Sequence, residues 1–200
     1  MPASVIVLAG PSGAGKTRLS RRLGLPVLNL DDFYKDGDDP TLPHLQLAGG
    51  APIVDWDSPG SWSAEDAVEA ICDLCSAGRA DVPVYEIARN GRVGTQRLEL
   101  HGSSYFVAEG IFAQEIVGAC RDRGVLADAV CVTQSPLVTF LRRLWRDLRE
   151  HRKPPLVLLR RGLHLVRTHQ AVVERAAALG CRVRHPDQAY EELCRLTAGR

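Results

Sequence analysis

The sequence predicts an α/β fold in which a parallel central sheet of about five strands lies between two layers of helices. Three observations predict it. An apolar run at residues 4–9 leads through a glycine-rich loop into a helical stretch at 17–23. Short apolar segments then alternate with helical patterns along the chain, which is typical of parallel sheets. Acidic residues follow two of the predicted strands, at the edge where open α/β sheets bind their ligands.

The glycine-rich loop at residues 10–17 has the pattern G-x-x-x-x-G-K-T, which is that of a phosphate-binding P-loop. Its glycines allow the backbone to curl so that N–H groups point at phosphate oxygens, and the helix N-terminus adds its dipole. Lys16 would reach the β- and γ-phosphates of ATP, and the Thr17 hydroxyl would hold Mg²⁺. The fold is therefore predicted to be a P-loop NTPase sandwich. The residues expected to bind ATP are Gly10, Ser12, Gly13, Ala14, Gly15, Lys16 and Thr17.

The next elements surround the predicted carboxyl edge of the sheet. A short strand at residues 27–30 runs into Asp-Asp-Phe-Tyr at 31–34. Residues 35–60 are rich in Gly and Pro and predict a long loop, which is usually functional in a compact domain. A helix is predicted between an N-cap at Ser63 and a C-terminal stop at Gly78.

A β-hairpin is predicted next, at about residues 82–100, with Asn90-Gly91 in the turn. It interrupts the alternation of strands and helices, so we expect it to stand apart from the main sheet. The remaining predicted elements are a strand at 104–108, a helix at 112–123, a strand at 129–132, helices from 135 and at 156–179, a strand at 181–184 and a helix at 187–196. We expect all 200 residues to form a single domain.

The composition argues against several classes of protein. The net charge of +1 argues against a nucleic-acid-binding protein that depends on bulk charge. No apolar run approaches the length of a membrane span, and no signal peptide is recognisable, so a cytoplasmic location is expected. The six cysteines are expected to be structural, because the C-x-x-C at residues 72–75 lies within a predicted helix and has no second pair at zinc spacing.

Five further motifs follow the P-loop in a fixed order. They are Asp31-Asp32-Phe33-Tyr34, Trp56-Asp57-Ser58-Pro59, Val82-Pro83-Val84-Tyr85, Val107-Ala108-Glu109-Gly110-Ile111 and Arg142-Arg143-Leu144-Trp145-Arg146-Asp147. With these motifs, the chain from residue 4 to about 150 resembles the uridine kinase-like branch of the P-loop kinases, which includes phosphoribulokinase and pantothenate kinase.

The resemblance implies roles for individual residues. Asp31 is expected to be the general base at the acceptor hydroxyl, a role for which a carboxylate must lie within hydrogen-bond reach of the leaving proton. Arg143 and Arg146 are expected to clamp the phosphates from a helical lid at about 142–167. The expected Mg²⁺ ligands are Thr17, Asp31 and Glu109, and the expected acceptor-binding residues are Tyr34, Asp57, Tyr85, Asn90, Arg92 and Glu109.

Two positions depart from the pattern of the uridine and cytidine kinases. Ile87 and Asn90 stand where those enzymes carry an aromatic residue and a histidine. The sequence therefore predicts an ATP- and Mg²⁺-dependent kinase whose small-molecule acceptor is uridine, cytidine or a related nucleoside. A non-nucleoside alcohol of the pantothenate or sugar-phosphate type, or a nucleotide-switched binding protein without kinase activity, are the alternatives. Assembly into a homo-oligomer stays open.

Overall fold

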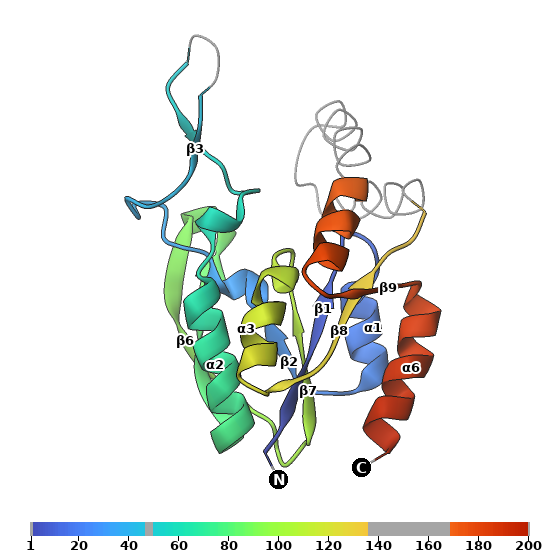
Figure 1. Cartoon of the computed structure of the whole chain (residues 1–200). Helices are drawn as coiled ribbons and strands as arrows, with labels where there is room; N and C mark the ends of the chain where they lie inside the picture. Colours follow the sequence, from blue (N-terminus) through green and yellow to red (C-terminus); the bar gives the residue numbers. More distant parts are fainter. Residues whose placement is uncertain (1, 47–49, 136–168, 200) are drawn as a thin grey trace.

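The computed structural model describes residues 2–46, 50–135 and 169–199. Its central sheet has five strands in the order β2-β7-β1-β8-β9, and every pairing in it is parallel (Figure 1). The strands are β1 (Ser4–Ala9), β2 (Val27–Asn29), β7 (Tyr105–Glu109), β8 (Leu126–Val132) and β9 (Arg182–Arg184). The predicted α/β class and parallel sheet are confirmed.

Helices cover both faces of this sheet, and β1 shows why. Its side chains alternate between two apolar cores, with Val5 and Val7 in one and Ile6 and Leu8 in the other. Because both faces are buried, the strand is a continuous apolar run rather than an alternating one. The helices are α1 (Lys16–Leu23) and α6 (Pro186–Ala198) on one face, and α2 (Ala64–Ala77), α3 (Val117–Asp122) and residues 169–178 on the other.

The ends of α2 lie where the sequence predicts them. The Ser63 side chain accepts a hydrogen bond from the amide of Asp66 at 3.3 Å, and Gly78 ends the helix in the left-handed conformation. Such an N-cap contributes about 1 kcal/mol to stability. The helix predicted at 112–123 is only partly right, because it opens with a 3₁₀ turn at Ala113–Ile116 before α3 begins.

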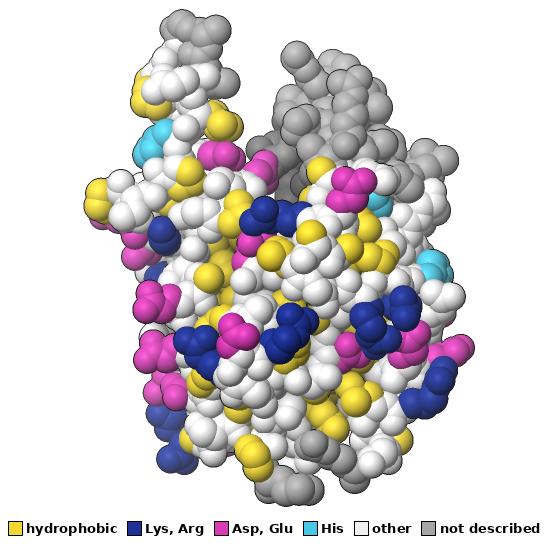
Figure 2. Space-filling view, in the orientation of Figure 1, with side chains coloured by type: hydrophobic (Ala, Val, Ile, Leu, Met, Phe, Trp, Pro, Cys, Tyr) yellow, Lys and Arg dark blue, Asp and Glu magenta, His cyan; other side chains and the backbone are white. Residues whose placement is uncertain are grey.

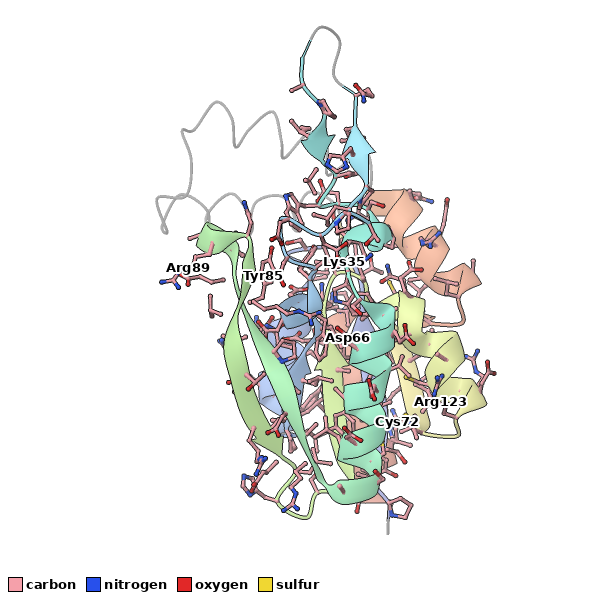
Figure 3. The ribbon with its side chains drawn as sticks, turned by 90° about the vertical axis from the view of Figure 1, so that its left-hand side faces the viewer. Lys35, Asp66, Cys72, Tyr85, Arg89 and Arg123 are labelled. Atoms are coloured by element: carbon pink, nitrogen blue, oxygen red, sulfur yellow. The ribbon has the colours of Figure 1, made fainter. Side chains whose placement is uncertain are left out.

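The predicted hairpin forms a separate antiparallel sheet of β5 (Arg79–Glu86) and β6 (Gly91–Glu99). Asn90 adopts a φ of 47° at its turn, as the Asn-Gly pair predicts. Ala80 and Val82 of β5 are buried in the same core as α2, and this packing fixes the hairpin beside that helix (Figure 3). The hairpin therefore forms a wall next to the carboxyl edge of the main sheet.

The long loop predicted at residues 35–60 contains structure that the sequence did not indicate. Two short strands, β3 (His44–Leu45) and β4 (Ile53–Val54), pair antiparallel in a hairpin that projects from the body of the molecule (Figure 1). The side chains of Leu45 and Ile53 are about half exposed. Strands this short, without a buried face, leave no alternating pattern to detect.

Three further predictions concern the lid, membrane-spanning segments and the cysteines. The lid at 142–167, with Arg143 and Arg146, lies outside the described residues. None of the helices in the described part of the chain combines the length and apolar character that a bilayer-spanning helix requires. Four cysteines are buried in the cores, where burial raises the pKa of Cys75 and Cys131 to about 11 and that of Cys120 and Cys181 to about 12.

Candidate active site

The P-loop follows β1 and leads directly into α1. Gly10 has a φ of 129°, and a Cβ there would lie 2.2 Å from the carbonyl oxygen of Val132, so only glycine fits. Gly15 is the N-cap of α1 and is also left-handed, with a φ of 103°. The Lys16 ammonium donates to the carbonyl of Gly10 at 2.7 Å, which holds this cation over the loop.

A pocket of about 300 Å³ lies between the P-loop and the ends of two neighbouring strands. One wall consists of the P-loop and the start of α1, and the other consists of residues that follow β2 and β7. The lining residues are Ser12, Gly13, Gly15, Lys16, Thr17, Arg18, Asn29, Asp31, Glu109, Gly110 and Ile111. The structure thus brings together five of the seven expected ATP-binding residues and both expected carboxylates. The other two, Gly10 and Ala14, are buried and do not line the pocket.

Asp31 is held against this pocket by backbone contacts. It lies in a 3₁₀ turn (Leu30–Phe33), and its own amide donates to Oδ1 of Asn29, the N-cap of that turn, at 3.3 Å. Its own Oδ1 accepts the amide N–H of Ile111 at 3.0 Å. A side chain at Gly110 would block this approach, because its Cβ would lie 2.9 Å from Asp31 Oδ1 and 2.7 Å from Leu30 Cβ.

Glu109, the last residue of β7, carries an unusual carboxylate. Its Oε2 is buried and has no hydrogen-bond partner among the described residues. A buried carboxylate oxygen without a donor is costly, and a cation is the group that compensates it best. No group of three or more His, Cys, Asp or Glu side chains forms a complete metal site within the described residues. A cation here would therefore depend on a bound ligand for further oxygens, as Mg²⁺ on phosphates does.

Aromatic side chains build the surface beside this pocket. The Tyr34 ring packs against the rings of Tyr85, Phe112 and Trp56, with centroids 5.6, 5.9 and 5.9 Å away. The Tyr34 hydroxyl donates to the carbonyl of Trp56 at 3.3 Å. Burial, with smaller contributions from the carboxylates of Asp31 and Asp57, raises the pKa of Tyr34, so this group stays a neutral donor. The Asp57 side chain itself is exposed.

Of the six expected acceptor residues, Glu109 alone lines the pocket, and the five others, Tyr34, Asp57, Tyr85, Asn90 and Arg92, do not. Asn90 and Arg92 lie on the hairpin. The Arg92 guanidinium donates to the carboxylate of Asp66 at 2.7 Å and to the carbonyl of Tyr34 at 3.2 Å. The carbonyl of Asn90 accepts the amide of Gly37 at 2.7 Å. These contacts tie the hairpin to α2 and to the segment after Tyr34; Figure 3 shows Asp66 on α2 beside the hairpin that carries Tyr85.

Known proteins resemble this chain over most of its length. No protein-family profile matches the chain. The chain is 29% identical over 154 residues to uridine kinase of Saccharomyces cerevisiae, and the match covers 72% of this chain and 29% of that protein. It is 26% identical over 158 residues to inorganic pyrophosphatase TTM1 of Arabidopsis thaliana, over 76% of this chain and 22% of that protein. It is 27% identical over 158 residues to uridine kinase of Histophilus somni, over 73% and 69% of the two chains.

One solved structure has a similar fold along most of its length. It is a protein of Silicibacter sp. TM1040 that carries the provisional name fructose transport system kinase, with a TM-score of 0.59 and 16% identity over 92% of this chain and 88% of that one. The resemblance to the uridine kinase-like P-loop kinases is confirmed. The chain spans less than a third of the length of the first two relatives, which are larger proteins.

This kinase-like fold contains site residues that the sequence did not indicate. Gln134, just after β8, donates from its Nε2 to the carbonyl of Ala14 at 3.0 Å. This hydrogen bond connects the end of β8 to the backbone of the P-loop. Its neighbour Thr133 lies 3.1 Å from Nε2 of His169, which is buried and whose pKa burial lowers. Thr133 and Gln134 have one signal in the sequence, which is that they follow a predicted strand at the edge of the sheet where ligands bind.

Charged side chains are mixed over the face shown in Figure 2. Ion pairs in the described part of the chain include Arg175 with Glu115 across 2.6 Å and Arg182 with Asp128.

Replacing Gly110 with Ala is expected to displace the Asp31 carboxylate. The added methyl group would overlap Leu30 Cβ and Asp31 Oδ1, so we expect turnover to fall about 10-fold. Overpacking should also lower the free energy of unfolding by about 1–3 kcal/mol. Gly118→Ala is the matched control, because nothing lies within 4 Å of its Cβ position on α3. Steady-state kinetics and urea unfolding measure both effects, and equal behaviour of the two variants would contradict the steric argument.

Proposed function

We propose that this protein is a Mg²⁺-ATP-dependent phosphotransferase with a small-molecule alcohol as acceptor. One observation carries the proposal: a fixed carboxylate, that of Asp31, faces the P-loop across a single pocket. A protein that only binds a nucleotide has no need for a base at this place, because a base serves to take the proton of an attacking hydroxyl. The named uridine kinases among the relatives support the same class of reaction.

In this reaction the acceptor hydroxyl gives its proton to Asp31 as its oxygen bonds to the γ-phosphorus and ADP leaves. The amide of Ile111 fixes Oδ1 of that carboxylate, so the base does not have to be reoriented during the reaction. Lys16 moves from the carbonyl of Gly10 to the phosphates and balances the charge that develops on them. Arg143 and Arg146 are proposed to close over the same phosphates and to exclude water.

The residues present fit a magnesium ion. The Thr17 hydroxyl and the carboxylates of Asp31 and Glu109 line the pocket, and the unpartnered Oε2 of Glu109 is the buried charge that such an ion would neutralise. When bound, Mg²⁺ would screen the phosphate charges and orient the triphosphate.

We propose a nucleoside, uridine or cytidine first, as the acceptor. The rings of Tyr34, Tyr85 and Phe112 offer a rigid apolar wall, and the exposed Asp57 carboxylate can accept hydrogen bonds from ribose hydroxyls. A specific observation favours a non-nucleoside alcohol as the second candidate. Ile87 is 76% exposed at the tip of the hairpin and provides no aromatic ring on which a base could stack.

An acceptor panel tests the proposed function. Purified protein with Mg-ATP is given uridine, cytidine, other nucleosides, pantothenate and sugar phosphates, and ADP release is followed. We expect release that depends on one acceptor class, with uridine or cytidine giving the highest kcat/KM. Inorganic pyrophosphate is a separate arm, because two relatives are named inorganic pyrophosphatases. Acceptor-independent nucleotide binding without turnover on any compound would contradict the proposal and favour a nucleotide switch.

A further inference from the structure

A side chain at the end of β2 connects the candidate base to the hairpin. Asn29 Oδ1 accepts the amide N–H of Asp31 at 3.3 Å, and Asn29 Nδ2 donates to Asp32 Oδ2 at 2.8 Å. Asp32 Oδ1 in turn accepts the amide N–H of Tyr85 at 3.4 Å. Because the backbone N–H can only donate and the carboxylate only accepts, these partners fix which way the Asn29 amide points.

The environment of Asp32 shows that this connection is costly to build. Asp32 is half-buried, and burial raises the pKa of its carboxyl, against the hydrogen bonds from Tyr85 and Asn29. A half-buried carboxylate is tolerated when hydrogen-bond donors reach both of its oxygens. Here the two donors, the Asn29 side chain and the Tyr85 amide, come from two separate elements. The chain Asn29–Asp32–Tyr85 therefore spans from the main sheet to the hairpin.

We propose that Asn29 and Asp32 are positioning residues, which hold the hairpin at a fixed distance from the carboxyl end of β2. The inference rests on the proposed function, because the hairpin carries Tyr85, whose ring packs against Tyr34 in the acceptor wall. The opposite strand has its own ties at the same end of the hairpin, where Arg92 is the cross-strand partner of Tyr85. The amide of Arg92 donates to Asp36, and that of Gly37 donates to the carbonyl of Asn90, both across 2.7 Å. Loss of the Asp32 link should therefore loosen β5 locally, at the Tyr85 amide, while β6 stays held.

A swap of the two side chains provides the test. Asp32→Asn places one NH₂ group against another, and Asn29→Asp places one carboxylate against another, so each single variant breaks the pair. The double variant N29D/D32N restores a donor opposite an acceptor and leaves acceptors for the amides of Asp31 and Tyr85. Asp81→Asn is the matched control, since Asp81 lies on the same strand β5 and pairs only with the exposed Arg97 across the hairpin.

The kinetic readout separates positioning from simple destabilisation. With uridine and ATP as the probes, we expect each single variant to raise KM for uridine about 10-fold, the effect of one lost hydrogen bond. Asp32 does not line the pocket, so D32N should leave kcat and KM for ATP nearly unchanged. Asn29 does line it, so N29D is judged by KM for uridine alone. The double variant should recover most of the loss, and Asp81→Asn should behave like the wild type. A merely structural role would lower the active fraction and thus kcat, without changing either KM and without recovery in the double variant.

Hydrogen exchange gives a readout that does not depend on turnover. The Tyr85 amide should exchange about 10-fold faster in each single variant and return toward the wild-type rate in N29D/D32N, while amides of β8 stay unchanged. If no acceptor is phosphorylated by the wild type, the proposed function fails, and hydrogen exchange still decides the link. Unchanged exchange at Tyr85 in the single variants, or no recovery in the double variant, would overturn the inference.

Discussion

Replacing Asp31 with Asn is expected to lower turnover at least about 100-fold while ATP binding is retained. The amide side chain can still accept the N–H of Ile111, so the local structure should survive. It cannot take a proton from the acceptor hydroxyl, and the loss of general-base catalysis costs about 10²–10⁴ in rate. Asp31 is exposed, so the substitution should leave the free energy of unfolding nearly unchanged.

Two measurements make this prediction decisive. Titration with ATP should give the same Kd for wild type and D31N, and acceptor-dependent ADP release should give the difference in kcat. Asp81→Asn makes the same chemical change on an exposed ion pair of the hairpin and should keep full turnover. Undiminished turnover in D31N would remove Asp31 from the role of base and would leave Glu109 as the other carboxylate of the pocket to test.

The predictable half of the site depends on short-range sequence rules. The P-loop could be predicted because eight adjacent residues and their flanking strand and helix determine its shape. The approach of Asp31 to Glu109 follows from a general rule, since β2 and β7 are parallel neighbours whose carboxyl ends meet at one edge. Neither step requires knowledge of how distant side chains pack.

The contacts that tune the site could not be predicted in the same way. Gly110 looks like any glycine in the sequence, and its importance appears only when Leu30 and Asp31 are found against its Cα. The sequence places Asn29 in a predicted strand and Asp32 just after it. Nothing in either position indicates that Tyr85, 53 residues after Asp32, donates to the Asp32 carboxylate. Such contacts link segments far apart in the chain, and a local pattern carries no information about their register.

The roles expected of Asn90 and Arg92 show the same limit. The family pattern places both in the acceptor site, whereas the structure engages the Arg92 guanidinium with Asp66 and with the backbone of Tyr34. An arginine that is already paired with a carboxylate would have to give up that pair to bind an acceptor. Their assignment to the acceptor site stays a prediction. The contacts of Arg92 with Asp66 and with the backbone of Tyr34 connect the hairpin to α2 and to the Tyr34 segment.

Replacing Lys16 with Ala is expected to abolish measurable ATP binding and to lower kcat/KM at least about 100-fold. In the structure this ammonium lies at the carbonyls of Gly10 and Pro11, 2.7 and 3.4 Å away, directly over the loop that would receive the phosphates. The glycine-rich loop supplies only neutral amides. Without the lysine, Arg18, which is exposed, would be the one cationic residue left in the lining of the pocket.

The matched control for Lys16→Ala is Arg21→Ala, which removes a positive charge from the exposed side of the same helix. If general electrostatic attraction explained the loss of ATP binding, both variants would raise the Kd for ATP by the same factor. High salt would then abolish the difference in Kd between each variant and the wild type. A specific contact instead leaves Arg21→Ala at the wild-type Kd at every salt concentration. The thermal midpoint of the K16A variant should stay within a few degrees of that of the wild type, because Lys16 is only partly buried. A loss of ATP binding in this variant can then not be ascribed to unfolding. Full ATP binding by K16A would show that the nucleotide does not use this loop, and the proposed function would fall with it.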